Sequence, residues 1–231
     1  YFQSFTRISY QKLTRMVEAR ISLPLQTQHA RMGLLSHTMQ HARLWLFIDG
    51  GCEFDRVAGS FGGSGNSWFG WLFATPFGHI VAEGTGTLRT MGEDVLGAIR
   101  SHSNSAEAAG CADALQFLIR HLEWFSSWIA GEQLGVCYDN GAGILTGLGF
   151  IKGLKEFGLA HANVEYTGVL EDQGWEIGSR HQTSHEYKGP IRTSNDPSEL
   201  LGEDDPRFFG QLNHRVDQTV GAESRSSGYR H

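Results

Sequence analysis

Three acidic residues stand at positions where they could act together on one chemical group. Asp49 closes the apolar run 44–48 and precedes a glycine pair, and Asp139 closes a second apolar run at 134–138. Glu107 lies near the start of a stretch with a helical pattern. A carboxylate at the end of a buried strand is costly to desolvate unless a partner compensates it, and three converging carboxylates repel one another. A bound divalent cation usually neutralises such repulsion, so the pattern indicates a site in which carboxylate oxygens bind a hard metal ion.

A buried strand and a hairpin are predicted ahead of the helical stretch. Residues 44–49 are continuously apolar up to the aspartate, which is typical of a strand buried on both faces, in the middle of a sheet covered by helices. Two further apolar runs, 68–75 and 79–88, flank Pro76 and Gly78, which occupy the second and fourth positions of a type I turn. We therefore predict that these two runs form an antiparallel hairpin after the first strand.

Helices and further strands are predicted after the hairpin. A helix begins near Ser105, because apolar residues recur after it with a 3.6-residue period, and a strand follows at 134–139. A second helix is predicted over 143–157. The last strand is placed at 175–181, with 163–170 as the alternative. This order predicts an α/β fold with a mixed five-stranded sheet, in which three antiparallel strands precede the parallel strands and helices flank the sheet.

Length and composition fit one globular domain with appendages. The chain has 231 residues, of which 40% are hydrophobic and 19% are charged. Residues 1–4 resemble the remnant of a cleavable expression tag, and the polar, basic residues 5–43 predict a helical leader or a part of a neighbouring domain. The domain itself is predicted over 44–205. Residues 206–231 are polar and are predicted to form a flexible C-terminal tail.

Composition also argues against several classes of protein. No window holds the ~18 consecutive apolar residues of a membrane span, and no secretory signal is visible, so no membrane partner is expected. The three cysteines are widely spaced and form no CxxC pair, which argues against a disulfide scaffold or a zinc knuckle. The expected location is intracellular, in the cytoplasm or the nucleus. The net charge of −6 is unfavourable for nucleic-acid binding, which must then depend on a local basic patch or on metal.

Three segments, taken in order, resemble motifs of the ribonuclease H family. In that family a DG-type strand end, an (S/T)N-x-x-E helix start and a (T/Y)D(S/N) strand end carry three catalytic acids. The matching segments here are Phe47-Ile48-Asp49-Gly50-Gly51, Ser103-Asn104-Ser105-Ala106-Glu107 and Val136-Cys137-Tyr138-Asp139-Asn140. The similarity is strongest to the RNase H domains of retroelement reverse transcriptases, and it extends over about residues 44–200.

The resemblance implies an activity, a cofactor and a substrate. It implies an endonuclease that hydrolyses the RNA strand of an RNA–DNA hybrid with two Mg²⁺ ions, for which Mn²⁺ can substitute. It also implies that the chain is part of a reverse-transcriptase polyprotein, and that the hybrid is recognised through its RNA 2′-hydroxyls. The residues that would bind the metal ions are Asp49, Glu107 and Asp139.

Two further site residues are implied by the segment that follows the last strand. His185 matches the family's loop histidine in an H-x-x-S-H pattern and would assist turnover. For the family's fourth acid we expect Asp196 as a further metal ligand and catalytic residue, with Glu199 as the reserve. The N-E-x-x-D helix start that carries the fourth acid in the family is not reproduced around these two residues.

Other interpretations of the same residues remain open. The acidic charge and the irregular fourth-acid region are compatible with a catalytically degenerate RNase H-like domain, used as a scaffold or for nucleic-acid binding in a larger assembly. A DNA nuclease or transposase-type enzyme of the same fold is a further alternative. His181 and His185 have the i, i+4 spacing of a zinc-binding helix, but Gly178 and Pro190 around them favour a strand and a loop.

Overall fold

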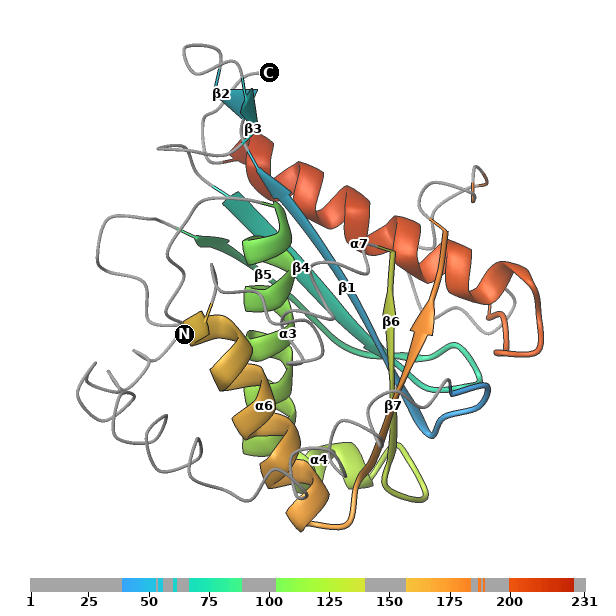
Figure 1. The fold of residues 1–231 in the computed structure, drawn as a ribbon. Helices are drawn as coiled ribbons and strands as arrows, with labels where there is room; N and C mark the ends of the chain where they lie inside the picture. The colour runs from blue at the N-terminus through green and yellow to red at the C-terminus, as the bar shows by residue number, and fades with distance from the viewer. Residues whose placement is uncertain are drawn as a thin grey trace.

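A five-stranded mixed sheet forms the centre of the molecule, in the order β5-β4-β1-β6-β7 (Figure 1). The computed structural model describes residues 39–52, 54–55, 60–61, 67–88, 103–139, 157–183, 187, 189 and 200–226. Strands β1, β4 and β5 are antiparallel neighbours, whereas β6 is parallel to β1 and β7 is parallel to β6. The predicted mixed sheet is therefore confirmed. Its strands are β1 (Leu44–Cys52), β4 (Ser67–Ala74), β5 (Ile80–Leu88), β6 (Gln133–Tyr138) and β7 (Glu176–His181).

Helices cover both faces of this sheet. On one face α3 (Ser103–Arg120) lies against β1 and β4, and α6 (Phe157–Asp172) packs beside α3. The short α4 (Leu122–Ser126) follows α3, and α7 (Arg207–Ser226) crosses the opposite face (Figure 1). A separate two-stranded pair joins β2 (Phe54–Asp55) to β3 (Ser60–Phe61). None of the described helices is both long and apolar enough to cross a membrane.

The central strand β1 is buried on both faces, as its continuous apolarity predicts. Leu46 and Ile48 belong to the core that lies under α3 and α6, whereas Trp45 and Phe47 belong to the core under α7. Side chains alternate between the two faces of a strand, so each face of β1 carries its own set of apolar side chains. The strand can therefore be apolar at every position, because both of its faces are covered by helices.

Helix α7 corrects the prediction of a flexible C-terminal tail. Its apolar residues follow one face of the helix and supply the second core with the partner that the sheet requires. Asp205 accepts a hydrogen bond from the Arg207 backbone N–H at 2.8 Å, which satisfies one of the free donors at the start of the helix. The hydrogen bonds from Arg207 lower the pKa of the Asp205 carboxyl to about 2. The buried apolar residues of α7 are Phe208, Phe209, Leu212, Val216 and Val220.

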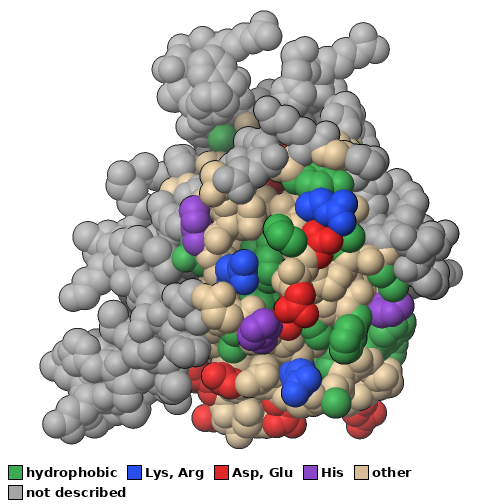
Figure 2. Space-filling view, turned by 90° about the vertical axis from the view of Figure 1, so that its right-hand side faces the viewer, with side chains coloured by type: hydrophobic (Ala, Val, Ile, Leu, Met, Phe, Trp, Pro, Cys, Tyr) green, Lys and Arg blue, Asp and Glu red, His purple; other side chains and the backbone are tan. Residues whose placement is uncertain are grey.

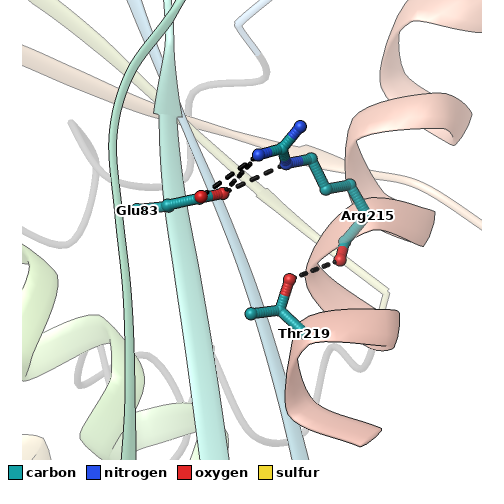
Figure 3. A network of polar contacts seen from close by, with 3 residues as sticks. All are labelled: Glu83, Arg215 and Thr219. Atoms are coloured by element: carbon teal, nitrogen blue, oxygen red, sulfur yellow. Dashed lines mark hydrogen bonds and ion pairs between the residues drawn. The ribbon is translucent and has the colours of Figure 1, made fainter. Parts of the chain in front are cut away.

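An ion pair fixes α7 to the edge of the sheet. The Arg215 guanidinium donates hydrogen bonds to both carboxylate oxygens of Glu83 on β5, the shortest at 2.8 Å (Figure 3). The Arg215 side chain is 15% exposed, and the Glu83 side chain is 45% exposed. Thr219 donates its hydroxyl to the Arg215 backbone carbonyl at 2.8 Å, one turn along the helix. A two-pronged contact of this kind fixes the orientation of the helix across the strands.

The hairpin between β4 and β5 confirms the predicted turn. The Gly78 backbone N–H donates to the Thr75 carbonyl at 2.9 Å, and Gly78 has a φ of 87°, a conformation that glycine adopts without strain. Strand β1 continues past Asp49, because Cys52 still pairs with Ser67 of β4. The predicted strand end at Asp49 is therefore three residues too early.

In the second half of the chain, one predicted position of the last strand is confirmed and the other is wrong. The preferred last strand at 175–181 corresponds to β7, and the alternative strand at 163–170 is wrong because those residues lie within α6. The predicted helix at 143–157 falls on residues outside the described part of the chain, apart from Phe157, at which α6 begins.

The packed domain also includes residues just before β1. Met39 and Ala42 are each 3% exposed and belong to the core under α7. The Met39 backbone N–H donates to the Ser179 carbonyl of β7 at 3.0 Å. Residues 39–43 are therefore part of this domain, although the sequence assigns them to a leader that ends at 43. Residues 1–38 lie outside the described part of the chain.

Candidate metal centre

Parallel pairing of β1 with β6 places two of the acids side by side. The register runs from Leu44 opposite Leu134 to Phe47 opposite Cys137. If this register is continued by two residues, Asp139 lies beside Asp49, just past the end of β6. Both acids are half-buried. The carboxyl ends of parallel strands are the usual place for sites in open α/β sheets.

The third acid reaches this edge because α3 begins directly over β1. A Cβ atom on Gly50 would lie 2.6 Å from the Glu107 backbone nitrogen and 2.9 Å from the Ala106 Cβ, so only glycine permits this approach. Glu107 stands fifth in α3 and is 3% exposed. The glycine that follows Asp49 therefore has a structural role, since it allows the first turns of the helix to bring Glu107 next to that aspartate.

The three carboxylates form one cluster. One ligand oxygen from each of Asp49, Glu107 and Asp139 lies within 4.8 Å of the others. Two unit charges about 5 Å apart repel by roughly 3 kcal/mol at an effective dielectric constant of about 20. A set of ligands made only of carboxylate oxygens suits hard divalent cations such as Mg²⁺, Mn²⁺ and Ca²⁺. The cluster can therefore hold a metal ion, which would remove this repulsion.

Local hydrogen bonds hold the two aspartates. An oxygen of the Asp49 carboxylate accepts the Gly50 backbone N–H at 2.8 Å. The Asp139 backbone carbonyl lies 3.2 Å from Nε2 of His181, which is the last residue of β7. The His181 ring also meets the Tyr138 ring edge to face, with their centroids 5.6 Å apart. His181 thus belongs to the candidate site, whereas in the sequence it stands only as the first histidine of the H-x-x-S-H pattern and as a zinc ligand that its neighbours argue against.

Helix α7 carries a further acid, Asp217, which the sequence-based choice of a fourth acid did not include. Gly70 is the cross-strand partner of Asp49, and a Cβ on Gly70 would lie 3.3 Å from Val216 Cγ1. Paired residues of antiparallel strands point to the same face, so Asp49 lies on the face that Val216 covers. Asp217 is the next residue of α7, and its carboxylate lies 3.7 Å from His214 Nδ1.

A sequence signal for this acid exists within α7. Asn213-His214-Arg215-Val216-Asp217 reproduces the spacing of the N-E-x-x-D helix start, with histidine in place of glutamate. The motif resemblance predicts the fourth acid shortly after His185, and the composition of residues 206–231 predicts a flexible tail. His185, Asp196 and Glu199 all lie outside the described residues, so their distances from the cluster are not part of the structure.

Three groups away from the acid cluster have raised pKa values because burial desolvates them. Burial raises the pKa of the Cys111 thiol to about 12 and raises that of Cys137 further. Both thiols stay protonated at neutral pH and are poor nucleophiles. Burial also raises the pKa of Asp113, while a hydrogen bond of 2.7 Å from the Trp71 indole N–H opposes this shift.

Comparison with known proteins identifies the fold. No protein-family model and no curated protein sequence matches the chain. Among solved structures, LC11-RNase H1, isolated from compost by a metagenomic approach, has a TM-score of 0.50 at 14% identity, with 83% of this chain and 100% of that chain covered.

Two other solved structures match with lower TM-scores. RNase H1 of the archaeon Halobacterium salinarum has a TM-score of 0.40 at 19% identity, with 62% of this chain and 86% of that chain covered. The protease–reverse transcriptase of prototype foamy virus has a TM-score of 0.45 at 17% identity, with 82% of this chain covered but only 22% of that chain. At such low identities the likeness concerns the fold alone. With the strand order and the flanking helices described above, the chain has the ribonuclease H-like fold.

Proposed function

We propose that this chain is a metal-dependent endonuclease that hydrolyses the RNA strand of RNA–DNA hybrids. The observation that carries the proposal is the convergence of Asp49, Glu107 and Asp139, with ligand oxygens within 4.8 Å of one another, in a ribonuclease H-like fold. The three acids come from two parallel strands and a helix that are far apart in the sequence. Each of the motifs that suggested them is weak alone, so it is their order along the chain together with this convergence that supports the proposal.

The acid cluster would hold two divalent cations, with Mg²⁺ as the expected ion and Mn²⁺ as its substitute. When bound, the ions would supply Lewis-acid chemistry, which lowers the pKa of the attacking water and stabilises negative charge on the leaving 3′ oxygen. Glu107 is 3% exposed and is fixed by the packing of α3 on β1, so its carboxylate would define the inner wall of the site. Asp49 and Asp139 are half-buried and would face the scissile phosphate.

Asp217 is part of this proposal as the fourth acid. It lies on α7 beside Val216, which covers the partner of Asp49, and the spacing from Asn213 fits the family's pattern. The sequence-based choice of Asp196 remains the alternative. A fourth carboxylate at this position would extend the ligand set from one face of the cluster and would support the binding of a second cation.

Other parts of the proposal rest on the motif resemblance. His185 would assist turnover, and the chain would belong to a reverse-transcriptase polyprotein within the cell. The second candidate function is a catalytically degenerate scaffold or nucleic-acid-binding domain, which the net charge of −6 favours. A degenerate domain would keep the fold, but it would have no need to bind divalent cations at the acid cluster.

A panel of labelled substrates tests this function. The full chain would be incubated with Mg²⁺ or Mn²⁺ and an RNA–DNA hybrid, duplex DNA, duplex RNA or single-stranded RNA. The proposal expects metal-dependent cutting of the RNA strand of the hybrid alone. Cutting of duplex DNA would favour the DNA nuclease or transposase-type alternative. If the folded protein cuts none of the substrates, whether or not it binds them, the result would favour the degenerate domain.

A further inference from the structure

The contact between His181 and Asp139 has a role that the acid cluster alone does not explain. Strands β6 and β7 pair in register up to Tyr138 opposite His181, and the Gln182 backbone N–H then donates to the Tyr138 carbonyl at 2.8 Å. Asp139 follows directly after this last pair. Its carbonyl is reached by the His181 side chain, at 3.2 Å from Nε2. The imidazole thus contacts the first backbone carbonyl beyond the last strand pair.

The chemistry of the contact fixes the position of one proton. A backbone carbonyl oxygen can only accept a hydrogen bond, so Nε2 of His181 must carry the donated hydrogen. The edge-to-face contact with the Tyr138 ring, at 5.6 Å between centroids, holds the imidazole in this orientation. The side chain is otherwise exposed, so packing alone does not account for its conformation.

The three acids of the cluster differ in how their backbone is held. Asp49 lies within β1 and pairs with Gly70 of β4. Glu107 lies within α3 and is packed on Gly50. Asp139 stands one residue beyond β6. The peptide before it is held by the hydrogen bond from the Gln182 N–H to the Tyr138 carbonyl, whereas the carbonyl of the peptide after it is contacted by the His181 side chain. If that second peptide could rotate, the Asp139 carboxylate would spread over several orientations, and metal binding would have to order it.

We propose that His181 is a positioning residue for Asp139. By donating from Nε2 to the Asp139 carbonyl, it holds the peptide at the end of β6 so that the carboxylate stays within reach of Asp49 and Glu107. This inference rests on the proposed function in that Asp139 must be a metal ligand. It does not require that the bound metal cleave any particular nucleic acid.

Two substitutions separate donation from ring packing. His181→Phe keeps a ring against Tyr138 and removes the N–H, whereas His181→Gln keeps an N–H donor at a similar reach and removes the ring. His79→Phe is a matched control, because His79 lies beside the turn between β4 and β5, at the other edge of the sheet. If His181→Phe does not fold, His181→Ala replaces it as the variant without a donor.

Metal binding is the first readout, measured as the apparent Kd for Mn²⁺ that describes how Tm rises with Mn²⁺ concentration. Loss of a partner that orients a ligand typically weakens metal binding by about 10–100-fold, and for this single contact we expect about tenfold in His181→Phe. His181→Gln should lie within about threefold of wild type, and His79→Phe should equal wild type. The second readout, hybrid cleavage, should show a lower kcat in His181→Phe at fixed metal concentration, with KM for the hybrid unchanged.

Several results would overturn the inference. One is equal metal affinity in His181→Phe and wild type, and another is an equal loss of metal affinity in the Phe and Gln variants. A third is a change in hybrid cleavage confined to KM, which would mean that His181 contacts the nucleic acid instead. Absence of any Mn²⁺-induced rise in Tm in the wild type would also overturn it, since Asp139 would then bind no metal ion. If the expected metal-affinity pattern appears without cleavage of a hybrid, the positioning role stands and the proposed nuclease function fails.

Discussion

At the scale of single residues, the fold holds three negative charges close together at one edge of the sheet. Asp49, Glu107 and Asp139 each contribute an oxygen within 4.8 Å of the others, and Glu107 is buried. In the absence of a cation this repulsion opposes folding. A cation that binds the folded state alone therefore stabilises the protein by mass action. Stability measured with and without metal consequently reports on the site independently of catalysis.

Replacing one carboxylate should make the metal-free protein more stable. We expect Asp139→Asn to raise the free energy of unfolding without metal by about 1 kcal/mol, because it removes two repulsive pairs that are partly screened by water. The same variant should lose most of the Tm rise that Mn²⁺ gives the wild type. Thermal unfolding with Mn²⁺ and with EDTA measures both effects. Asp172→Asn, at the exposed end of α6, is the control and should change neither quantity.

The identity of the fourth acid can be decided by two matched substitutions. We expect Asp217→Asn to lower the rate of hybrid cleavage by about 10–100-fold, the usual cost of weakening a metal site through one group. Asp196→Asn should leave the rate close to that of wild type. Single-turnover cleavage at saturating Mg²⁺ measures both variants. If Asp196→Asn were the slow variant and Asp217→Asn cut at the wild-type rate, Asp196 would be the fourth acid.

At the scale of elements, the site depends on how closely α3 approaches β1. Gly50 makes this approach possible, since a Cβ there would lie 2.6 Å from the Glu107 backbone nitrogen. Gly51 is its neighbour in the same strand, but a Cβ there would meet only Val220 Cγ1, at an ordinary distance of 3.4 Å. The two glycines are thus a natural pair for testing which contact positions the cluster.

Gly50→Ala should damage both the fold and the metal site. The added methyl must push α3 away from β1, and overpacking of this kind typically costs about 1–3 kcal/mol. Because Glu107 moves with the helix, the Tm rise given by Mn²⁺ should also fall. Urea unfolding with and without Mn²⁺ measures both changes. Gly51→Ala should stay within about 0.5 kcal/mol of wild type, and equal effects of the two variants would contradict the role given to Gly50.

The sequence predicts those elements whose signals are local. Strand β1 follows from its apolar run, and the hairpin follows from Pro76 and Gly78. The mixed sheet follows from joining this antiparallel hairpin to strands that helical crossovers connect. The end of β1 is misplaced because pairing with β4, a long-range contact, extends the strand through the glycine pair to Cys52. Position within a sheet therefore overrides the local indication that glycines end a strand.

Two features of the second half of the chain escape sequence reasoning for physical reasons. Helix α7 is polar on average, so composition indicates a flexible tail, while the apolar residues that pack on the sheet recur every four positions from Phe208 to Val220. The site residues Asp49, Glu107 and Asp139 could be found because two of them end an apolar run of the sequence, the third lies near the start of a helical pattern, and all three lie in motifs that resemble those of one family. Asp217 could not be found in this way, since it stands in the middle of a helix.

At the scale of the whole molecule, α7 supplies a complete layer. Without it, the face of the sheet that carries Trp45, Phe47 and Leu72 would be exposed to water. Five apolar residues of α7 are buried there, and full burial of each such side chain contributes about 1.5–3 kcal/mol. Their sum is comparable to the whole stability of a domain, roughly 5–15 kcal/mol. We therefore expect the domain not to fold without this helix.

Truncation of one buried residue in this layer should be strongly destabilising. Leu212 is 0% exposed, and Leu212→Ala should lower the free energy of unfolding by about 2–5 kcal/mol, because it removes buried methyl groups and leaves a cavity. Urea unfolding followed by circular dichroism measures the change. Gln218→Ala, at an exposed position of the same helix, should remain within about 0.5 kcal/mol of wild type. A loss below about 1 kcal/mol for Leu212→Ala would contradict the packing of α7 on the sheet.

The charge of the molecule constrains how a nucleic acid could bind. On the face that carries α7, acidic, basic and histidine side chains are interspersed with apolar ones, and no continuous basic surface is seen among the described residues (Figure 2). The chain as a whole has a net charge of −6. We therefore expect cations bound at the acid cluster, rather than this face, to offset the charge of the phosphates next to the site.

The central claim is that the acid cluster is the catalytic metal site of an RNA-cleaving nuclease. The most direct test is strand-resolved cleavage of an RNA–DNA hybrid carrying a different label on each strand, with wild type and Asp139→Asn compared at equal folded concentration in Mg²⁺ and in EDTA. We predict that wild type cuts only the RNA strand and only with metal, and that Asp139→Asn cuts at least about a hundredfold more slowly, since each metal contact supplies several kcal/mol to the transition state. Equal cutting by the two proteins, or no cutting by folded wild type with either Mg²⁺ or Mn²⁺, would contradict the claim.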